Sequence, residues 1–468
     1  MVADLSSSVL RSSDRPALID GLTGEVLTHR ELEARSRRYA LALLRTTRPG
    51  DVLALAARNE PAWAVAFHGA LRAGLAVTPV NPMLTAAEVS AQVRATNASV
   101  VVTAASLGDL PGSDVGTLPS VDPDAVAVMP TTSGTTGCAK VALLTHRNIV
   151  ANIAQHQQIS PVTEQDVFCA AIPFCHMYGQ TLVLGAALAA GATVVTMPRF
   201  DPEAYLDLLH RYRVTRLHIA PPVLATLATA GPLPALRGVL CGGAPADLAL
   251  LAAAEQRLGC PIRQGYGMTE ASPGTHLADE ATPPGSIGRP VPGTRCRVVD
   301  PVSGSDVPPG TPGELWVSGP QVMRGYVGEE PVGEWLRTGD LVRVDADGCY
   351  WVVDRLKDLI KYKGYQVVPG ELESLLRRHP AVVNAGVVGV ADPVAGELPH
   401  AFVVRRGDVT AEELLNWVAA EVAPYKRIRS AEFVDSLPVT PAGKLARREL
   451  RAWVTPRRNS RPENTEIT

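Results

Sequence analysis

The segment from residue 130 to residue 146, PTTSGTTGCAKVALLTH, constrains this chain most strongly. Its first eleven residues combine serine and threonine hydroxyls with glycines and Lys140. The apolar run 125–129 before it predicts a buried strand, and residues 148–154 after it predict a helix. Glycines let the backbone approach an anion, hydroxyls donate to its oxygens, and a lysine adds positive charge. The segment therefore predicts a phosphate-binding loop. A flexible polar loop is the alternative, and the Walker A order is absent.

Composition excludes several other classes of protein. The chain has 468 residues, which predicts two or three domains, and 46% of them are hydrophobic. A net charge of −3 argues against general nucleic-acid binding and against a basic membrane-binding patch. The seven cysteines are scattered without a metal-binding spacing, so we expect them to be reduced. Since no signal peptide or span-length apolar run is evident, we expect a cytoplasmic protein without membrane partners.

The order of the apolar runs predicts an α/β fold. Strands alternate with helices before and after the glycine-rich loop, which predicts two doubly wound layers with parallel sheets. Residues 1–15 are expected to be loosely ordered. We expect a large N-terminal domain over 1–354 with a β-rich subdomain at about 287–353, where short strands alternate with Pro/Gly turns. A smaller α+β domain over 355–455 and a disordered tail at 456–468 would complete the chain.

The glycine-rich loop resembles the phosphate loop of the AMP-forming adenylating enzymes. That superfamily contains acyl-CoA synthetases, peptide-synthetase adenylation domains and firefly luciferase, and its usual pattern is [ST]-SGTTG-x-PKG. Here Ala139 and Val141 stand in place of Pro and Gly, which alters the exit of the loop. The resemblance implies ATP as a substrate, and its phosphates would contact Thr132, Ser133, Gly134, Thr135, Thr136, Gly137 and Lys140.

Three further segments match the family's nucleotide motifs in order. The segment 265–270 resembles YGxTE, which implies that Tyr266 stacks on adenine, Thr269 contacts the α-phosphate and Glu270 holds Mg²⁺. A carboxylate beside a polyphosphate requires a divalent cation to screen repulsion. Residues 338–340 resemble TGD, whose aspartate, here Asp340, would accept both ribose hydroxyls. Arg355 would reach ribose or phosphate, or form a salt bridge at a hinge. The remaining nucleotide-side candidates are Gly243, Ala244, Pro245, Gly265, Gly267 and Met268.

The C-terminal part carries two more motifs. Residues 361–373 are close to the acyl-CoA-ligase form, which implies that Lys361 and Gln366 lie on the nucleotide side. Lys363 and Gly364 would line a CoA tunnel, because glycine lets pantetheine pass close to the backbone. Lys444, in a segment that resembles P-x-GK, would bridge the carboxylate and the α-phosphate during adenylation. An isolated lysine on a glycine turn is otherwise usually solvated. Lys357 matches the hinge about which the family rotates a mobile C-terminal domain.

The acid-binding segments resemble the 4-coumarate–CoA ligase branch most. That resemblance implies a pocket whose glycine floor forms a flat slot for an aryl or arylacryloyl acid. His176 would lie between the acid site and the thiol tunnel and is a candidate catalytic residue, although a histidine at a strand end is also commonly a packed, neutral one. No Ser-His-Asp order supports a hydrolase. The candidate pocket residues are Tyr178, Thr181, Gly242, Pro273, Gly274 and Thr275.

These resemblances imply a two-step ligase of secondary metabolism. A small carboxylic acid and ATP would give an acyl-AMP and pyrophosphate, and the acyl group would pass to the thiol of CoA. A carrier-protein pantetheine or an amine is an alternative acceptor. Another alternative is the activation of nitrite for diazotisation of an aryl amine. A non-catalytic nucleotide-binding protein is the alternative of another class. The oligomeric state stays open.

Overall fold

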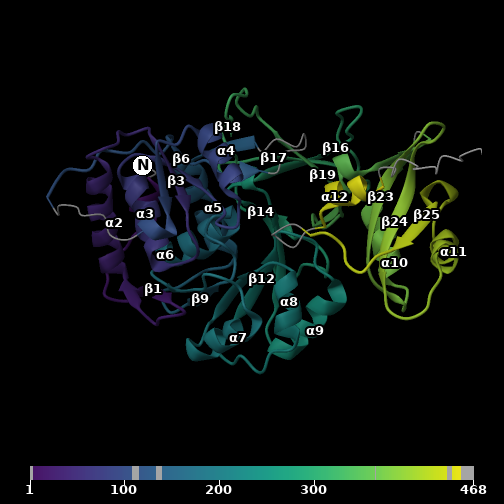
Figure 1. Cartoon of the computed structure of the whole chain (residues 1–468), viewed down its shortest axis with the longest axis horizontal. Coiled ribbons are helices and arrows are strands. Elements are labelled where there is room, and N and C mark those ends of the chain that lie inside the picture. The colour runs from purple at the N-terminus through teal and green to yellow at the C-terminus, as the bar shows by residue number, and fades with distance from the viewer. Residues whose placement is uncertain (1–3, 108–114, 133–139, 364, 440–444, 455–468) are drawn as a thin grey trace, which may run out of the picture.

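The computed structural model describes residues 4–107, 115–132, 140–363, 365–439 and 445–454. Three sheets and their helices form a large N-terminal part, and a fourth sheet forms a smaller C-terminal part at one end of the long axis (Figure 1). This arrangement confirms the predicted α/β architecture of a large and a small domain. No helix among the described residues is both long and apolar enough to cross a membrane.

The sheet that contains the glycine-rich segment has seven strands. Strands β3, β4, β5 and β6 pair in parallel, as predicted from their alternation with helices, whereas β8 pairs antiparallel with β6 and with the edge strand β18. In spatial order the strands are β18 (Gly325–Tyr326), β8 (Lys140–Thr145), β6 (Val126–Val128), β4 (Ala76–Pro79), β3 (Val52–Ala56) and β5 (Val100–Thr103), with β7 (Thr131–Thr132) beside β8.

The second sheet has nine strands and holds most of the acid-side candidates. Its centre is parallel, and its two ends turn antiparallel at β2 and at β14 and β15. In spatial order it contains β15 (Arg289–Pro290), β14 (Gly274–Leu277), β13 (Ile262–Gly267), β12 (Gly238–Gly242), β11 (Arg216–Ile219), β9 (Val167–Ala170), β10 (Thr193–Thr196), β1 (Pro16–Asp20) and β2 (Val26–Thr28).

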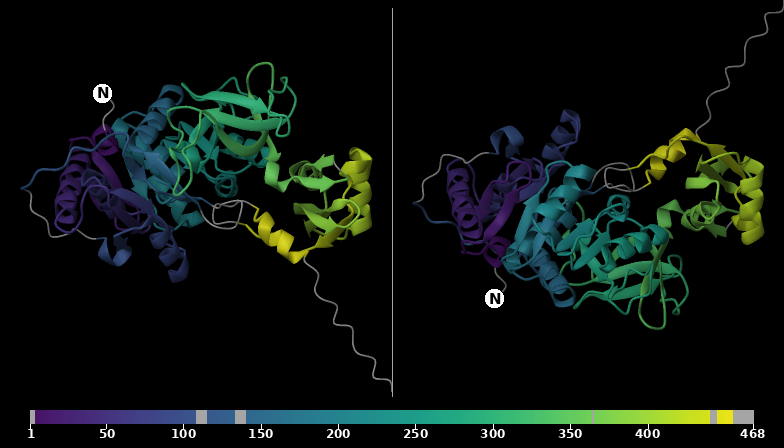
Figure 2. Two further views of the ribbon diagram at one scale, coloured as in Figure 1. Left: turned by 90° about the horizontal axis from the view of Figure 1, so that it is seen from above. Right: turned by 90° about the horizontal axis from the view of Figure 1, so that it is seen from below.

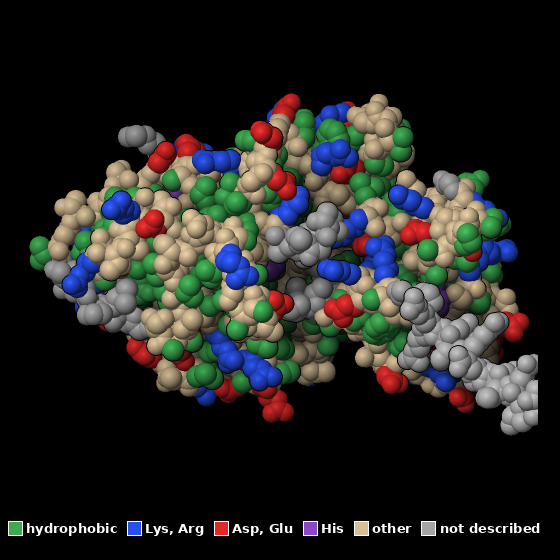
Figure 3. All heavy atoms as spheres, turned by 45° about the horizontal axis from the view of Figure 1, so that its top comes forward, with side chains coloured by type: hydrophobic (Ala, Val, Ile, Leu, Met, Phe, Trp, Pro, Cys, Tyr) green, Lys and Arg blue, Asp and Glu red, His purple; other side chains and the backbone are tan. Residues whose placement is uncertain are grey.

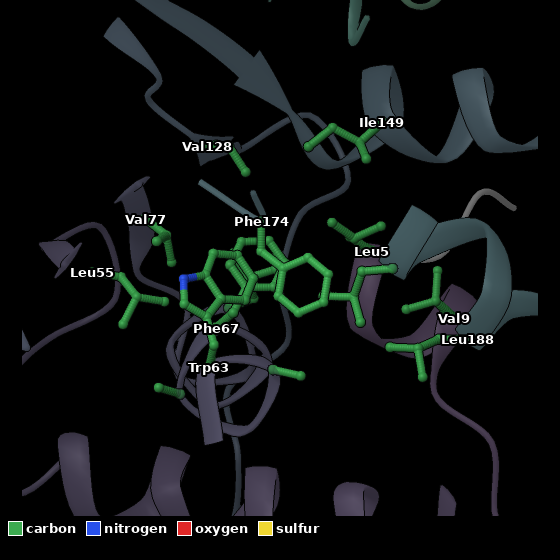
Figure 4. Packing of buried hydrophobic residues seen from close by; sticks show 14 of the residues in the cluster. Leu5, Val9, Leu55, Trp63, Phe67, Val77, Val128, Ile149, Phe174 and Leu188 are labelled. Carbon is green, nitrogen blue, oxygen red and sulfur yellow. The ribbon is translucent and has the colours of Figure 1, made fainter. Parts of the chain in front are cut away.

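Helices fill the space between these two sheets and cover the outer face of the second. The inner layer contains α1 (Leu5–Val9), α2 (His29–Leu43), α3 (Pro61–Arg72), α5 (His146–Ile159) and α6 (Ala186–Ala190). Its aromatic centre is formed by Trp63, which stacks on Phe67 at 4.9 Å between ring centroids and contacts Phe174 at 5.5 Å (Figure 4). The outer layer contains α7 (Pro202–Arg211), α8 (Pro222–Ala228) and α9 (Leu248–Leu258). Helix α4 (Ala86–Thr96) follows β4.

Several helix starts follow directly from local sequence. Thr28 and Thr85 form the predicted capping boxes with Glu31 and Glu88, in which each side chain satisfies a free backbone N–H of the first turn. The expectation of a loosely ordered N-terminus is wrong for α1. Leu5 and Val9 of that short helix are buried in the inner layer.

The strand–loop–helix order predicted around the glycine-rich segment is also wrong in one element. Strand β8 lies between that segment and α5, so β7 and β8 form an antiparallel pair that frames it. Helix α5 begins only after Thr145, which caps it through a capping box with Asn148. The N-terminus of α5 therefore does not follow the loop directly. The loop residues 133–139 lie outside the described residues.

The remaining two sheets carry the C-terminal motifs. The β-rich sheet contains β16 (Arg295–Val299), β17 (Gly313–Ser318), β19 (Leu336–Val344) and β20 (Tyr350–Arg355). The short 3-10 helix η4 (Leu356–Asp358) then leads into the smaller part, which lies apart at the end of the molecule in both views of Figure 2. That part contains β21 (Ile360–Tyr362), β22 (Tyr365–Val367), β23 (Val382–Asp392), β24 (Gly396–Arg405), β25 (Ser430–Phe433), α10 (Pro369–Arg377), α11 (Ala411–Glu421) and α12 (Arg447–Trp453).

Candidate active site

Three predicted nucleotide residues from separate motifs meet at one point. The hydroxyl of Tyr266, on β13, donates to Oδ2 of Asp340, on β19, at 2.6 Å. Nε of Arg355, at the end of β20, lies 3.0 Å from Oδ1 of the same carboxylate. Asp340 is buried, and burial of the Tyr266 phenol together with the Asp340 charge raises the pKa of Tyr266 well above its usual value. Each carboxylate oxygen has a second lone pair, so Asp340 retains acceptor capacity for ribose hydroxyls.

A second cluster connects the exit of the glycine-rich segment to Glu270. The hydroxyl of Tyr326 donates to Oε1 of Glu270 at 2.7 Å. Nζ of Lys140 lies 4.7 Å from the centre of the Tyr326 ring and 2.7 Å from Oε1 of Glu329. Thr132, on β7, also lies near the Tyr326 hydroxyl. Residues predicted for phosphate and for metal binding are therefore joined through one phenol.

The surroundings of Glu270 suit a metal ion that binds together with a nucleotide. Glu270 is buried at the start of the 3-10 helix η3 (Thr269–Ala271), and Tyr326 holds one of its two oxygens. Among the described residues no group of three or more His, Cys, Asp or Glu side chains is placed to hold a metal. Mg²⁺ commonly takes one or two protein carboxylates and completes its shell with substrate phosphates and water. The donor set here suits that arrangement.

The acid-side candidates lie beside the nucleotide strand. Gly242, on β12, is the register partner of Gly265, on β13. A Cβ at position 242 would lie 3.1 Å from the carbonyl oxygen of Gly265 and 3.7 Å from Cε1 of Tyr178. Tyr178 begins the π-helix η2 (Tyr178–Gly185), and its hydroxyl donates to the Leu240 carbonyl at 2.9 Å. The structure thus brings Tyr178 and the glycine strands together, as the predicted slot requires.

The segment after η3, residues 273–275, contacts both helix α5 and strand β13. Gly274, on β14, accepts from the side-chain amide of Asn152 at 2.7 Å and donates to the same side chain at 3.0 Å. Met268 donates to the carbonyl of Pro273 at 2.9 Å, which fixes the turn between the two. The Thr275 hydroxyl donates to the Tyr266 carbonyl at 3.4 Å. The turn therefore joins the predicted adenine and acid residues.

The other candidate residues differ from one another in burial and in local structure. His176 is exposed, and its Nδ1 accepts from the backbone N–H of Tyr178 at 3.1 Å, so it caps the turn before η2. Thr181 is fully buried on η2. Gly243 has a positive φ of 87° after β12, a conformation that favours glycine, and it precedes Ala244 and Pro245. Thr269 is half-buried in η3.

In the smaller part, Lys361, Lys363 and Gln366 belong to the hairpin of β21 and β22. Lys361 and Gln366 are exposed cross-strand partners on β21 and β22, and neither side chain has an ion-pair or hydrogen-bond partner among the described residues. Lys363 is exposed at the turn. Lys357 lies in η4 between the β-rich sheet and the smaller part, where its carbonyl accepts from Arg451 at 3.3 Å. Gly364 and Lys444 lie outside the described residues.

A hollow opens between the large part and the smaller part (Figure 3). Lysine and arginine side chains gather along its rim in that view. The sequence did not single out Tyr326, Glu329 or Asn152, and none of them belongs to a recognisable motif. Their contribution depends on contacts across 56 residues for Tyr326 to Glu270 and 122 for Asn152 to Gly274.

Two family models match the chain, one to each part. The model described as "AMP-binding enzyme" matches residues 5–327, and "AMP-binding enzyme C-terminal domain" matches residues 371–444. These matches and the fold define an ATP-using, AMP-forming ligase. The chain belongs to the AMP-binding enzyme family and is a ligase of the acyl-CoA synthetase type.

Characterised relatives support this assignment along nearly the whole chain. The chain is 37% identical to 4-coumarate–CoA ligase 3 of Oryza sativa subsp. japonica, over 94% of this chain and 89% of the relative. Among solved structures, ATP-bound MatB from Rhodopseudomonas palustris has a TM-score of 0.88 at 27% identity and covers 97% and 99% of the two chains. O-succinylbenzoate coenzyme A synthetase from Bacillus subtilis, in complex with ATP and magnesium, has a TM-score of 0.86 at 30% identity and covers 95% and 98%.

Proposed function

We propose that the chain adenylates an aryl or arylacryloyl carboxylic acid with ATP and then transfers the acyl group to CoA. One structural observation carries this proposal. Tyr266 of the nucleotide cluster lies on β13, and Tyr178 of the acid-side residues bonds to the neighbouring strand β12, which pairs with β13 at Gly242 and Gly265. An acid bound beside Tyr178 would have its carboxylate next to the α-phosphate of a nucleotide stacked on Tyr266. The name of the rice relative supports an arylacryloyl acid.

The first step needs orientation and charge neutralisation. An acid carboxylate oxygen attacks the α-phosphorus, and pyrophosphate leaves. Asp340 would fix the ribose, and Glu270 would hold Mg²⁺, which supplies neutralisation of phosphate charge when bound. Lys444 would stabilise the negative charge that develops between the carboxylate and the phosphorus. Holding both reactants in line converts a bimolecular reaction into an effectively unimolecular one, which lowers the barrier further.

Lys140 must change its partner for this step. In the structure its ammonium pairs with Glu329 and lies over Tyr326. Both members of the ion pair are partly exposed, with side-chain exposures of 34% and 46%, and such pairs contribute at most about 1 kcal/mol. The ammonium can therefore leave Glu329 for a phosphate at small cost.

An aromatic and basic surface on the smaller part favours CoA as the acceptor. Tyr365 is 56% exposed and stacks on Tyr425 with 4.6 Å between ring centroids. Its cross-strand partner Tyr362 lies 4.8 Å from the Arg429 guanidinium and 5.7 Å from the Lys363 ammonium. Exposed aromatic rings stack on purine bases, and cations beside them bind phosphates. CoA carries an adenine and phosphates beyond its pantetheine, whereas a carrier-protein arm lacks the adenine.

The experiment that tests the proposal separates the two half-reactions. Acid-dependent ATP–pyrophosphate exchange without an acceptor measures adenylation over a panel of aryl acids, arylacryloyl acids and nitrite. Adding CoA, and separately pantetheine, then measures transfer through the mass of the product. We expect exchange with aryl acids and a lower KM for CoA than for pantetheine. Exchange with nitrite alone, or a product that forms only with an amine, would contradict the proposal.

Matched variants make the acceptor test sharper. Arg429→Ala should raise the KM for CoA toward that for pantetheine, because one phosphate-binding cation is lost, and leave exchange unchanged. Arg378→Ala serves as the control, because Arg378 is also an arginine of the smaller part and pairs only loosely with Glu421, at 3.8 Å. If the two variants affect the KM for CoA equally, the surface does not bind the nucleotide end of CoA.

A further inference from the structure

His276 contacts the aromatic ring that is proposed to stack on adenine. Strand β14 pairs with β13 in a register that places His276 opposite Tyr266. The imidazole is fully buried, and its ring meets the Tyr266 ring edge to face, with 5.8 Å between the centroids and 69° between the planes. Tyr266 itself is only half-buried, so part of its ring stays accessible to a base. His276 therefore supports this ring from the protein interior.

The imidazole of His276 is itself fixed by three neighbours. Its Nδ1 lies 3.0 Å from Oγ1 of Thr275, and its Nε2 lies 3.7 Å from Sγ of Cys296, on β16. The ring also packs against Tyr350, on β20, with 4.6 Å between the centroids. A neutral imidazole has one donor and one acceptor nitrogen, so it can bond to both polar neighbours at once. His276 thus ties the strand beside Tyr266 to the β-rich sheet.

A histidine beside a cysteine is also the arrangement of a nucleophilic pair, but the charge states here do not suit that chemistry. Burial lowers the pKa of His276 to about 3 and raises the pKa of Cys296 to about 12. Both groups are therefore neutral at physiological pH, whereas a nucleophilic cysteine has to be a thiolate. The contact between them can orient the imidazole without any role in covalent chemistry.

The opposite end of the Tyr266 ring is fixed by a different contact. Its hydroxyl donates to Asp340 at 2.6 Å. This hydrogen bond fixes the tip of the ring, but it lies on the axis about which the ring rotates, and that torsion is intrinsically soft in tyrosine. Only a neighbour against the side of the ring can fix its plane. His276 is such a neighbour, and its own orientation is locked by packing and hydrogen bonds.

We propose that His276 is a positioning residue for the nucleotide, which sets the plane of the Tyr266 ring so that the ring lies parallel to the adenine base. The proposal rests on the adenine-binding role of Tyr266, which is part of the proposed function. It adds a residue that acts through Tyr266 and does not touch the nucleotide. Stacking on the base is equally strong before and during the reaction, so its loss weakens ATP binding without slowing the chemical step.

Two measurements on the full chain test this role. Calorimetry with ATP and Mg²⁺ gives the Kd for ATP, and ATP–pyrophosphate exchange gives kcat and the KM for ATP and for the acid. We expect His276→Ala to raise the Kd and the KM for ATP by about 10-fold, because a tilted ring loses much of its stacking on the base. The kcat and the KM for the acid should change by less than about 2-fold. Partial loss of folded protein would instead lower the apparent kcat and leave the Kd unchanged.

Two further variants of the same contact make the test specific. His276→Phe keeps an aromatic ring against Tyr266, so its Kd for ATP should stay within about 3-fold of the wild-type value. Tyr266→Leu removes the stacking ring and should itself weaken ATP binding. In that background His276→Ala should change the Kd by less than about 2-fold, because His276 then has no ring to orient.

His68→Ala is the matched control for the loss of a buried imidazole. His68 is also buried and also meets an aromatic ring edge to face, since its centroid lies 5.2 Å from that of Phe67. It belongs to α3, in the inner helix layer. This variant should keep the wild-type Kd for ATP.

The outcomes separate this inference from the proposed function. A wild-type Kd in His276→Ala, or an equal rise in His276→Ala and His276→Phe, would overturn the inference alone. An unchanged Kd in Tyr266→Leu would overturn the adenine-binding role of Tyr266 and the inference with it. Because the Kd is measured without an acid or CoA, a failure of exchange with every aryl acid would contradict the proposed function and leave the test of His276 intact.

Discussion

The hydroxyl of Tyr326 donates to the carboxylate of Glu270 at 2.7 Å, and Lys140 lies over the same ring. Tyr326 belongs to β18, which pairs with β8 directly after the glycine-rich segment. Burial and the nearby Glu270 charge raise the pKa of Tyr326, so its hydroxyl stays protonated and acts as a donor. This contact orients the candidate metal carboxylate and ties it to the strand that follows the phosphate loop.

Glu270→Gln should lower acid-dependent pyrophosphate exchange by orders of magnitude. The amide keeps the shape of the side chain but removes the negative charge that would hold Mg²⁺. The measurement is exchange as a function of Mg²⁺ concentration. Glu330→Gln is the matched control, since Glu330 is an exposed carboxylate in the turn after Tyr326. Near-normal exchange by Glu270→Gln would show that the metal is held elsewhere.

Lys444→Ala should abolish adenylate formation and spare transfer from a supplied acyl-adenylate to CoA. In the family resemblance this lysine acts on the charge that develops in the first step only. Exchange measures the first step, and thioester formation from synthetic acyl-AMP measures the second. An equal loss of both steps in a folded variant would refute the role assigned to Lys444.

Lys357→Pro should separate the two half-reactions. A hinge residue must change its φ and ψ, and proline fixes φ near −65°. Neighbouring contacts tie this segment to the smaller part, since Asp358 lies 3.7 Å from Arg447 and 3.5 Å from Arg451. We expect exchange to survive and product formation to fall steeply.

Lys357→Ala is the control for the hinge, because it removes the side chain but leaves the backbone free. Both half-reactions should then continue. If exchange and product formation fall together in Lys357→Pro, or if neither falls, rotation about Lys357 does not take place in this protein.

Lowering the pH should reduce the folding stability of the large part, because of its buried histidines. Burial lowers the pKa of His68 to about 3 and that of His146 to about 4, against about 6.5 in an unfolded chain. Between pH 6.5 and these values the unfolded state binds protons that the folded state excludes. Each such histidine therefore lowers the free energy of unfolding by about 1.4 kcal/mol per pH unit as the pH falls.

His68→Gln should lessen this dependence and move the midpoint of acid unfolding to lower pH. Glutamine does not titrate and can still hydrogen-bond to Ser6, which contacts Nδ1 of His68 at 3.1 Å. Circular dichroism across an acid titration measures the midpoint, and the exposed His210→Gln is the control. An unchanged midpoint in His68→Gln would show that His68 is protonated in the folded protein.

Local signals predicted most of the elements that position the site. The capping threonines Thr28 and Thr85 and the alternation of short apolar runs identified helices and parallel strands, because caps and periodicity act over a few residues. The family resemblance implied nucleotide roles for Tyr266, Asp340 and Arg355, and the structure brings the three together.

Elements that depend on distant partners were not predictable in this way. The six residues of β8 follow the glycine-rich segment directly, and their strand conformation depends on β6, β7 and β18 as partners. The contact of His156 with Gly274 joins segments 118 residues apart, and a glycine in a sequence does not reveal which side chain fills the space it leaves. Long-range packing decides such positions.

The central claim is that an acid is activated as an acyl-adenylate. An aryl acid labelled with ¹⁸O in both carboxylate oxygens, turned over with ATP and CoA, tests it most directly. Attack of the carboxylate on the α-phosphorus places one labelled oxygen between carbon and phosphorus, and thiol attack on the carbonyl leaves that oxygen on AMP. The account predicts AMP that carries one ¹⁸O for each acyl-CoA formed. Unlabelled AMP, or label found in phosphate together with ADP, would contradict it.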